Sequence, residues 1–325
     1  FCIFDIMKKI LVTVISIFIS FLLFGQHKGV VNLSVTDMKA DAGYSKESIS
    51  QATLGTPVEI IDSTGYWYKI VTPEGYRGWT TRKNVTPMSD GRFDQWRNSK
   101  RWIVTDYFAI VRSDSSHQSQ VIGDCVMGNI IEKGDKSKVN GFVSVIFPDG
   151  REGYIEESKV EDFDEWLSSR EATAENIVNV ALKFVGFPYL WGGLSPKGFD
   201  CSGLMKFSYF MNGIILLRDA REQINTGKRV DCSDILSNFQ KGDLIFFGTK
   251  ATAKRAMRVT HVGLYIADGE MVHSSFLVRI NSLLPGKENS YTSKPIVGAT
   301  RILGNQDRED GIVSIVNHPW YFLSK

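Results

Sequence analysis

The sequence predicts an α+β domain in the C-terminal half of the chain, preceded by two small all-β domains. Residues 28 to 160 read as short β-runs separated by Gly, Pro, Asp and Asn turns, and no helix of convincing length is expected there. Residues 171 to 184 and 201 to 211 carry apolar side chains at helical spacing. Residues 260 to 275 read as two β-runs joined by an Asp-Gly pair, which is a strong hairpin signal.

The chain has 325 residues, enough for two or three domains. Its 43% hydrophobic and 23% charged residues are typical of a globular protein. The net charge is +2 and the basic residues are scattered, so nothing favours nucleic-acid binding. We expect upstream residues and a signal peptide at 1–25, β domains at 26–88 and 89–161, and the α+β domain at 162–325.

The beginning of the chain is typical of an export signal. Met7-Lys-Lys is followed by an apolar run from Ile10 to Phe24, and residues 1–6 look like sequence upstream of the true start. A retained membrane anchor is the alternative, but the run is short for a spanning helix. We therefore expect an exported protein, periplasmic or extracellular after cleavage, with no membrane attachment of the mature chain.

The two β domains are predicted from an internal repeat. The segment Pro73 to Val85 matches Pro148 to Val160, and each contains a Gly-x-x-Gly-aromatic turn. Two copies indicate two similar domains rather than a solenoid, which needs at least three repeats. The copies differ in the turn, where Tyr76 of the first copy is replaced by Arg151 in the second.

The α+β domain follows a connector at 163–170 and begins with a helix whose apolar face belongs to the core. Its second helix starts near Cys201, after Asp200 or Ser202 as a possible cap. The first amides of a helix have no intrahelical partner and carry the positive end of its dipole, which favours a thiolate. The alternative is that Cys201 is a small buried core residue.

Two histidines lie near the outer ends of the predicted hairpin strands. A cysteine at a helix start, His261 to take its proton and a second polar group such as His273 to orient that ring suit nucleophilic acyl transfer. A two-residue turn at Asp268-Gly269 would pair His273 with Leu264, however. A bulge or a wider turn is therefore required if the two histidines are to meet.

Cysteine chemistry other than catalysis is not expected. Cys2 would leave with the signal peptide, and the three remaining cysteines cannot all pair. Zinc is the rival use of cysteine and histidine, but there is no C-x-x-C pair. We expect no disulfide framework, no metal and no cofactor. The remaining cysteines are Cys125, Cys201 and Cys232.

Several spaced motifs resemble those of the NlpC-type cell-wall cysteine peptidases, in the same order, over about the last 150 residues. The β repeat is similar to the bacterial SH3-like domains that often accompany such peptidases. The motifs are Tyr189-Leu-Trp-Gly-Gly, Phe199-Asp-Cys-Ser-Gly, Arg218-Asp-Ala with Gln223, Gly242-Asp-Leu-Ile-Phe-Phe, His261-Val-Gly-Leu-Tyr and His273-Ser-Ser.

The resemblance implies a papain-like peptidase domain with defined catalytic roles. Cys201 attacks the amide carbonyl, His261 takes the thiol proton and later protonates the leaving amine, and His273 orients the His261 ring. Tyr189 supplies its hydroxyl to the oxyanion together with the Cys201 backbone amide. From the residues alone, Tyr189 could instead simply pack its loop.

The resemblance also implies a substrate site. Asp200, Ser202 and Asp219 match positions that line the L-Ala and D-Glu side of the substrate in the family, although Asp219 could only cap a helix. In the subfamily with two SH3-like domains, residues matching Glu47 and Tyr76 bind the free amino group of the terminal L-alanine. A carboxylate and a phenol facing an ammonium make charge-assisted hydrogen bonds that a blocked amine cannot make.

The resulting hypothesis is a cysteine endopeptidase that cleaves L-Ala-γ-D-Glu-diamino-acid peptides derived from peptidoglycan during turnover or recycling, as a monomer. Alternatives are hydrolysis of stem peptides in intact wall, a wall-binding protein without activity, and acyl transfer to an acceptor other than water. The basic run from Lys250 to Arg258 is either a solvated loop or an attractor for the carboxylates of such peptides.

Overall fold

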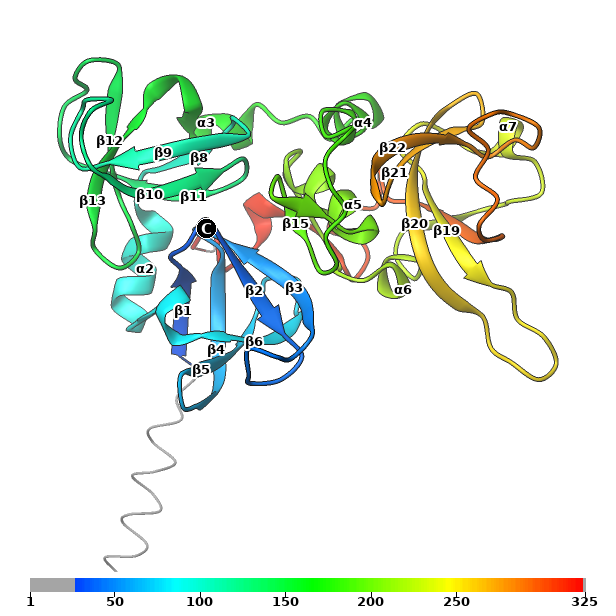
Figure 1. Cartoon of the computed structure of the whole chain (residues 1–325), viewed down its shortest axis with the longest axis horizontal. Coiled ribbons are helices and arrows are strands. Elements are labelled where there is room, and N and C mark those ends of the chain that lie inside the picture. Colours follow the sequence, from blue (N-terminus) through cyan, green and yellow to red (C-terminus); the bar gives the residue numbers. More distant parts are fainter. Residues whose placement is uncertain (1–26, 324–325) are drawn as a thin grey trace, which may run out of the picture.

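The computed structural model describes residues 27–323, in which an α+β unit follows two all-β units, as expected (Figure 1). The expected signal peptide lies outside these residues. Within the described range, no helix is both long and apolar enough to cross a bilayer.

The two β units share one strand order. The first sheet runs β3-β2-β6-β5-β4-β1-β7 and the second β10-β9-β13-β12-β11-β8-β14, so each strand of one has a counterpart in the other. The sequence repeat thus corresponds to a repeated topology. We call these units the first and second barrels. Their strands are β1 (His27–Val31), β2 (Val35–Lys39), β3 (Ser48–Thr53), β4 (Pro57–Thr64), β5 (Trp67–Val71), β6 (Arg77–Thr81) and β7 (Val85–Met88), then β8 (Arg101–Val104), β9 (Phe108–Arg112), β10 (Val121–Val126), β11 (Ile130–Lys133), β12 (Phe142–Ile146), β13 (Glu152–Glu156) and β14 (Val160–Asp162).

A helix follows each barrel, and the expectation of no helix before residue 160 was wrong at α2 (Asp90–Asn98). The side chain of Ser89 caps this helix, and two aromatic side chains bury one face of it. The helix α3 (Phe163–Ser168) carries an equivalent aromatic pair, so the repeat extends beyond the strands. The stacked pairs are Phe93 with Trp96, at 5.9 Å between ring centroids, and Phe163 with Trp166, at 6.0 Å.

The C-terminal unit packs helices against one antiparallel sheet of order β18-β23-β19-β20-β21-β22. The helix α5 (Cys201–Phe210) contacts α4 (Ala174–Leu182) and the strands β20 and β21. Its residues from Ser202 to Tyr209 are all buried, so the helix is held firmly. The other elements are β15 (Leu194–Ser195), β16 (Gly198–Phe199), β17 (Ile214–Leu216), α6 (Ala220–Gln223), β18 (Lys228–Val230), α7 (Ile235–Asn238), β19 (Leu244–Thr249), β20 (Arg258–Ala267), β21 (Glu270–Ser275), β22 (Leu277–Ser282), β23 (Ile296–Arg301) and β24 (Ile312–Ser314).

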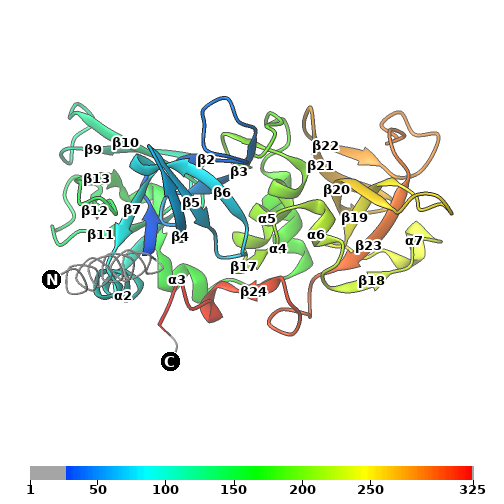
Figure 2. The ribbon, with the colours of Figure 1, turned by 90° about the horizontal axis from the view of Figure 1, so that it is seen from below.

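The end of the described chain runs back from β24 toward α3 and the barrels (Figure 2). Arg101, in strand β8 of the second barrel, donates to the Tyr321 carbonyl at 3.1 Å, and His318 Nε2 donates to the Pro73 carbonyl of the first barrel at 3.0 Å. This segment therefore helps to hold the barrels against the C-terminal unit.

Candidate active site

Cys201 is the first residue of α5, as predicted, and its side chain is half-buried. The Asp200 carboxylate caps the helix by accepting the Gly203 amide at 2.7 Å. Of the two expected candidates, Asp200 and not Ser202 is therefore the N-cap of α5. All three cysteines of the described range are free.

The electrostatics of Cys201 differ from the expectation that a helix start favours the thiolate. Burial, followed by the negative charge of Asp200, raises the pKa of the Cys201 thiol to about 12. Hydrogen bonds from the Val262 and Ser202 amides and the charge of Arg218 oppose this rise without cancelling it. The resting group is therefore a thiol, and it needs a base to become a nucleophile.

A bulge in the predicted hairpin brings the two histidines together. Leu264 pairs with Val272, and the register shifts between Tyr265 and Ala267. Continued along the strands, this register sets His273 opposite position 263, two residues from His261. Side chains at positions 261 and 263 lie on the same face of a strand, so both histidines project from one face.

Position 263 is a glycine for a steric reason. A Cβ atom there would lie 2.7 Å from Met271 Sδ and 3.3 Å from His273 Cβ. With no side chain at Gly263, the rings meet above it, and His261 Nε2 lies 2.6 Å from His273 Nδ1.

Asn281 of β22 completes this chain of hydrogen bonds. Its amide nitrogen donates to the Asn289 carbonyl, and its Oδ1 lies 2.8 Å from His273 Nε2. Because Oδ1 can only accept, His273 Nε2 carries a proton and His273 Nδ1 is an acceptor. His261 Nε2 is then the donor to His273, which leaves His261 Nδ1 as the unprotonated nitrogen.

Both imidazoles are neutral in the resting protein. The pKa of His261 is lowered to about 3, mainly by burial. The nearby charges of His273, Lys294 and Arg279 add to this decrease. Burial also lowers the pKa of His273 to about 4, against the opposing hydrogen bond to Asn281. The ring of Tyr291 stacks on His261 with centroids 5.5 Å apart. A neutral imidazole beside a protonated thiol is suited to general-base activation.

Tyr189 lies in the loop before Cys201. Its backbone amide donates to the Phe276 carbonyl at 3.0 Å, which ties this loop to the turn between β21 and β22. Burial and the proximity of Cys201 raise the pKa of the Tyr189 phenol, so the hydroxyl keeps its proton. It remains available as a hydrogen-bond donor beside Cys201.

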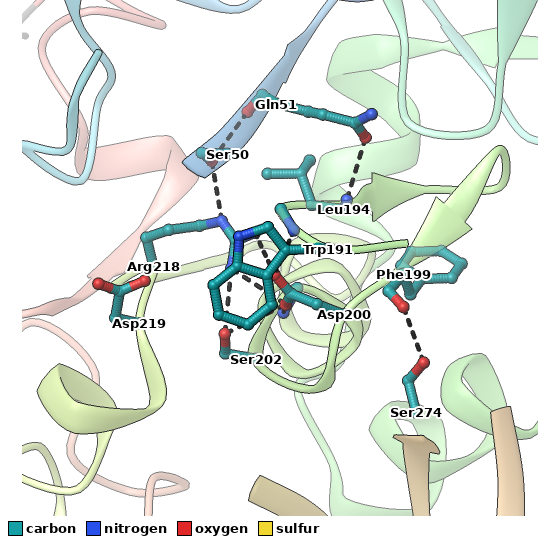
Figure 3. A network of polar contacts seen from close by, with 12 residues as sticks. Ser50, Gln51, Trp191, Leu194, Phe199, Asp200, Ser202, Arg218, Asp219 and Ser274 are labelled. Atoms are coloured by element: carbon teal, nitrogen blue, oxygen red, sulfur yellow. Dashed lines mark hydrogen bonds and ion pairs between the residues drawn. The ribbon is translucent and has the colours of Figure 1, made fainter. Parts of the chain in front are cut away.

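Asp200 and Ser202 belong to a buried ion-pair network (Figure 3). Arg218 binds the two carboxylate oxygens of Asp200 at 3.1 and 2.6 Å and the Ser202 hydroxyl at 3.0 Å. The Gly192 amide also donates to Asp200, at 3.1 Å. These contacts give Asp200 and Ser202 a role in supporting α5, and their contact with substrate stays a prediction.

The first barrel reaches this network directly. Ser50 Oγ accepts from Arg218 Nε at 2.8 Å, and Gln51 Oε1 accepts from the Leu194 amide at 3.2 Å (Figure 3). The α+β unit and the first barrel therefore share buried polar contacts beside α5.

Glu47 and Tyr76, the two barrel residues singled out from the sequence, both contact the α+β unit. The Trp191 indole donates to Glu47 Oε1 at 2.9 Å. The Tyr76 hydroxyl lies 3.5 Å from both oxygens of Asp219, and burial, followed by the charge of Asp219, raises the pKa of Tyr76 to about 12. Arg151, the counterpart of Tyr76 in the second barrel, instead donates to the Asn32 carbonyl at 3.4 Å.

Comparison with known proteins decides the family. A model described as the NlpC/P60 family matches residues 186–301, and a model described as the bacterial SH3 domain matches residues 34–86, within the first barrel alone. The gamma-D-glutamyl-L-lysine dipeptidyl-peptidase of Bacillus cereus is 30% identical over 78% of this chain and 75% of its own length. Dipeptidyl-peptidase 6 of Lysinibacillus sphaericus is 30% identical over 78% of this chain and 91% of its own length. The chain belongs to the NlpC/P60 family.

Solved structures agree with this assignment. The crystal structure of an NlpC/P60 family protein from Bacillus cereus superposes with a TM-score of 0.69, at 25% identity, over 85% of this chain and 99% of that one. The expected fold is confirmed as a papain-like NlpC/P60 domain after an N-terminal SH3-like region. The chain is accordingly a member of a family of cysteine peptidases of the cell wall.

Sequence reasoning missed several residues of this NlpC/P60 site. Asn281 and Tyr291 follow the second histidine in the chain and belong to no motif that was recognised. An asparagine within a strand is unusual, and this was the one available signal for Asn281. Arg218 was noticed only as part of a motif, and its burial between Asp200 and the first barrel could not be foreseen.

Proposed function

We propose that this protein is a cysteine endopeptidase that hydrolyses the γ-D-glutamyl-diamino-acid bond of peptidoglycan peptides bearing a free N-terminal L-Ala. The observation that carries the proposal is the placement of Glu47 and Tyr76 of the first barrel against Trp191 and Asp219, beside the nucleophile helix. Such peptides arise in wall turnover, and we propose that the protein meets them outside the cytoplasm.

The reaction begins with proton transfer from the Cys201 thiol to Nδ1 of His261. The thiolate attacks the γ-carbonyl of D-glutamate, while the Tyr189 hydroxyl and the Cys201 amide stabilise the oxyanion. His261 then returns the proton to the amine of the leaving diamino acid, and a thioester remains on Cys201. Water, deprotonated by His261, hydrolyses the thioester and releases L-Ala-γ-D-Glu. His273, held by Asn281, keeps the His261 ring in the required tautomer throughout.

The free amine of the substrate is recognised at the barrel. An L-alanine ammonium that binds Glu47 and the oxygen of Tyr76 gains charge-assisted hydrogen bonds, and Asp219 adds a second negative charge nearby. Acetylation would remove the charge and leave the carboxylate without a matching donor. The site therefore favours released peptides over stem peptides whose alanine is still linked to the glycan.

This proposal is supported by the two similar proteins from Bacillus cereus and Lysinibacillus sphaericus, both of which are named as dipeptidyl-peptidases. Removal of a dipeptide requires that the site recognise the amino end of the chain. A carboxylate at the position of Glu47 offers a way to bind that end. We further propose the domain limits 26–88, 89–161 and 162–325, with the second barrel as another SH3-like domain because it shares the strand order of the first.

The deciding experiment compares hydrolysis of L-Ala-γ-D-Glu-diaminopimelate with hydrolysis of the same peptide acetylated at its alanine nitrogen. Cys201→Ala provides the blank, and Glu47→Gln removes the charge while keeping the shape. We expect cleavage of the free peptide alone, and loss of that preference in Glu47→Gln. Glu59→Gln, in strand β4 of the same barrel, makes the same change of charge and is the matched control.

Equal cleavage of both peptides by the unmodified protein would retain the peptidase activity and refute amine recognition by Glu47. Cleavage of neither, with binding to isolated peptidoglycan, would refute the proposed activity and favour a wall-binding role.

A further inference from the structure

Arg279 lies on the same face of the sheet as the catalytic histidines. It is directly opposite His273 in the pairing of β21 with β22, and directly opposite residues of antiparallel strands project to one side. The side chain is half-buried, and its Nε is buried without a hydrogen-bond partner. Among residues 27–323, no carboxylate forms an ion pair with Arg279.

Lys294 is a second cation on this side of the site. It is exposed and lies in the loop between β22 and β23, three positions after Tyr291. The ring of Tyr291 stacks on His261. The charges of Lys294 and Arg279 both act on His261, in keeping with their proximity to that ring. Lys294 has no ion-pair partner within the described part of the chain either.

Two cations on the barrel side of Cys201 are in a different situation, because each has a carboxylate partner. Arg218 is paired with Asp200 at 2.6 Å, and Arg221 is paired with Asp219 at 2.8 Å. Of these four cations, the two without an ion pair, Arg279 and Lys294, are on the histidine side of Cys201. The basic run predicted from the sequence lies farther out, at the tip of the hairpin between β19 and β20 (Figure 1).

The position of the leaving residue follows from the reaction. The leaving amine takes its proton from His261, so the diamino acid lies on the histidine side of Cys201, while the L-Ala end points to the first barrel. In Figure 1, α5 lies between the first barrel and the strands β20 to β22. The two unpaired cations are thus on the side that receives the leaving diamino acid.

We propose that Arg279 and Lys294 form the subsite for the leaving residue and select meso-diaminopimelate over L-lysine; this inference rests on the proposed function. As the third residue of the substrate, diaminopimelate and lysine both carry a carboxylate on the α-carbon, next to the scissile amide. Diaminopimelate has a second carboxylate at its far end, which pairs with a cation and neutralises its own distal ammonium. Lysine ends in a bare ammonium, which two unpaired cations repel.

The test is the ratio of kcat/KM for L-Ala-γ-D-Glu-meso-diaminopimelate to that for L-Ala-γ-D-Glu-L-Lys, measured on each variant. The ratio cancels any effect of a substitution on the shared catalytic groups. We expect the unmodified protein to prefer diaminopimelate by at least about tenfold, which is the factor supplied by one hydrogen bond to a charged group.

Arg279→Gln and Lys294→Gln should each reduce the ratio, Arg279→Lys should retain most of it, and Arg279→Glu should reverse it. Lys287→Gln is the control, because it removes one positive charge from the same loop at an exposed position. Lys294 is exposed, so its replacement should not disturb folding. The Lys294→Gln variant therefore tests the proposal even if the Arg279 variants fold poorly.

An unchanged ratio in Arg279→Gln and Lys294→Gln, or equal cleavage of both peptides by the unmodified protein, would overturn the inference while the proposed peptidase activity stands. Cleavage of neither peptide would overturn the proposed function and this inference with it.

Discussion

At the scale of single residues, the tautomers of the paired histidines are set by an amide that has no role in the proposed chemistry. The carbonyl of Asn289 orients the Asn281 amide, which fixes the tautomer of His273 and, through it, that of His261. The positions of Cys201 at a helix start and of His261 on a strand could be predicted from local patterns, while their catalytic roles stay predictions. Asn281 could not, because its relation to His273 depends on the register of β21 with β22.

The first prediction concerns Asn281. In Asn281→Ala, His273 loses the acceptor for its Nε2 proton, so the tautomer that serves His261 is no longer favoured. We expect kcat to fall about tenfold, the equivalent of one hydrogen bond of roughly 1.4 kcal/mol. Steady-state kinetics on the free tripeptide would measure this. A carboxylate should favour the imidazolium, so Asn281→Asp should move the acid limb of the pH profile upward; an unmoved limb would contradict the relay.

The second prediction concerns pH. His261 must be neutral to accept the thiol proton, and its pKa of about 3, with about 4 for His273, keeps both neutral in mild acid. We expect kcat/KM to persist to about pH 5, where an ordinary histidine with a pKa near 6.5 is already protonated. A limb centred near pH 6.5 would contradict the neutral pair.

Stability must be followed in the same pH series. Histidines of the unfolded chain bind protons near pH 6.5, whereas these two do so only below about pH 4 in the folded state. The unfolded state therefore binds more protons in this window, and stability decreases as the pH falls through it. Circular dichroism at each pH separates lost folding from lost catalysis.

At the scale of elements, the site depends on a hairpin whose turn was predictable and whose bulge was not. Asp268 and Gly269 have φ of 51° and 78°, as a two-residue turn with left-handed residues requires. The extra residue lies between Tyr265 and Ala267, where nothing in the local sequence marks it. Only the need for both histidines to share a face indicated that the regular pairing had to be broken.

The third prediction tests the room beneath the histidines. In Gly263→Ala, the new methyl group lies too close to Met271 Sδ and tightly against His273 Cβ, so Met271 must shift and His273 is pushed out of its present position. We expect kcat to fall at least about tenfold, with overpacking that costs roughly 1 to 3 kcal/mol of stability. Gly91→Ala in α2 is the control, since its added Cβ meets nothing within 4 Å. Activity equal to that of the unmodified protein would refute this role of Gly263.

At the scale of the whole molecule, the repeat and the order of domains could be predicted, but the contact between domains could not. Gln51 and Leu194 are 143 positions apart and meet through buried polar atoms. Local patterns describe how each unit folds on itself, and they contain no information about which faces meet. Only the family resemblance indicated that the first barrel reaches the peptidase domain.

The fourth prediction concerns this interface. Gln51→Ala leaves the buried Leu194 amide without its acceptor, which should cost about 1 to 3 kcal/mol. Because the contact joins two units, we expect both to unfold at a lower temperature in calorimetry. Gln118→Ala, at an exposed position of the second barrel, should leave the transition unchanged. An unaltered transition in Gln51→Ala would show that the bond contributes little.

The hydrogen bond between Trp191 and Glu47 gives the site an optical reporter. Trp191 is 60% exposed, and its indole N–H donates to the carboxylate proposed to receive the substrate ammonium. An ammonium that arrives at Glu47 competes for the same charge, so the emission of Trp191 responds to occupancy rather than to turnover. In a Cys201→Ala protein, binding of a peptide with a free amine can therefore be followed by tryptophan fluorescence without any cleavage. Comparison with Trp191→Phe separates this signal from that of the other six tryptophans of the chain.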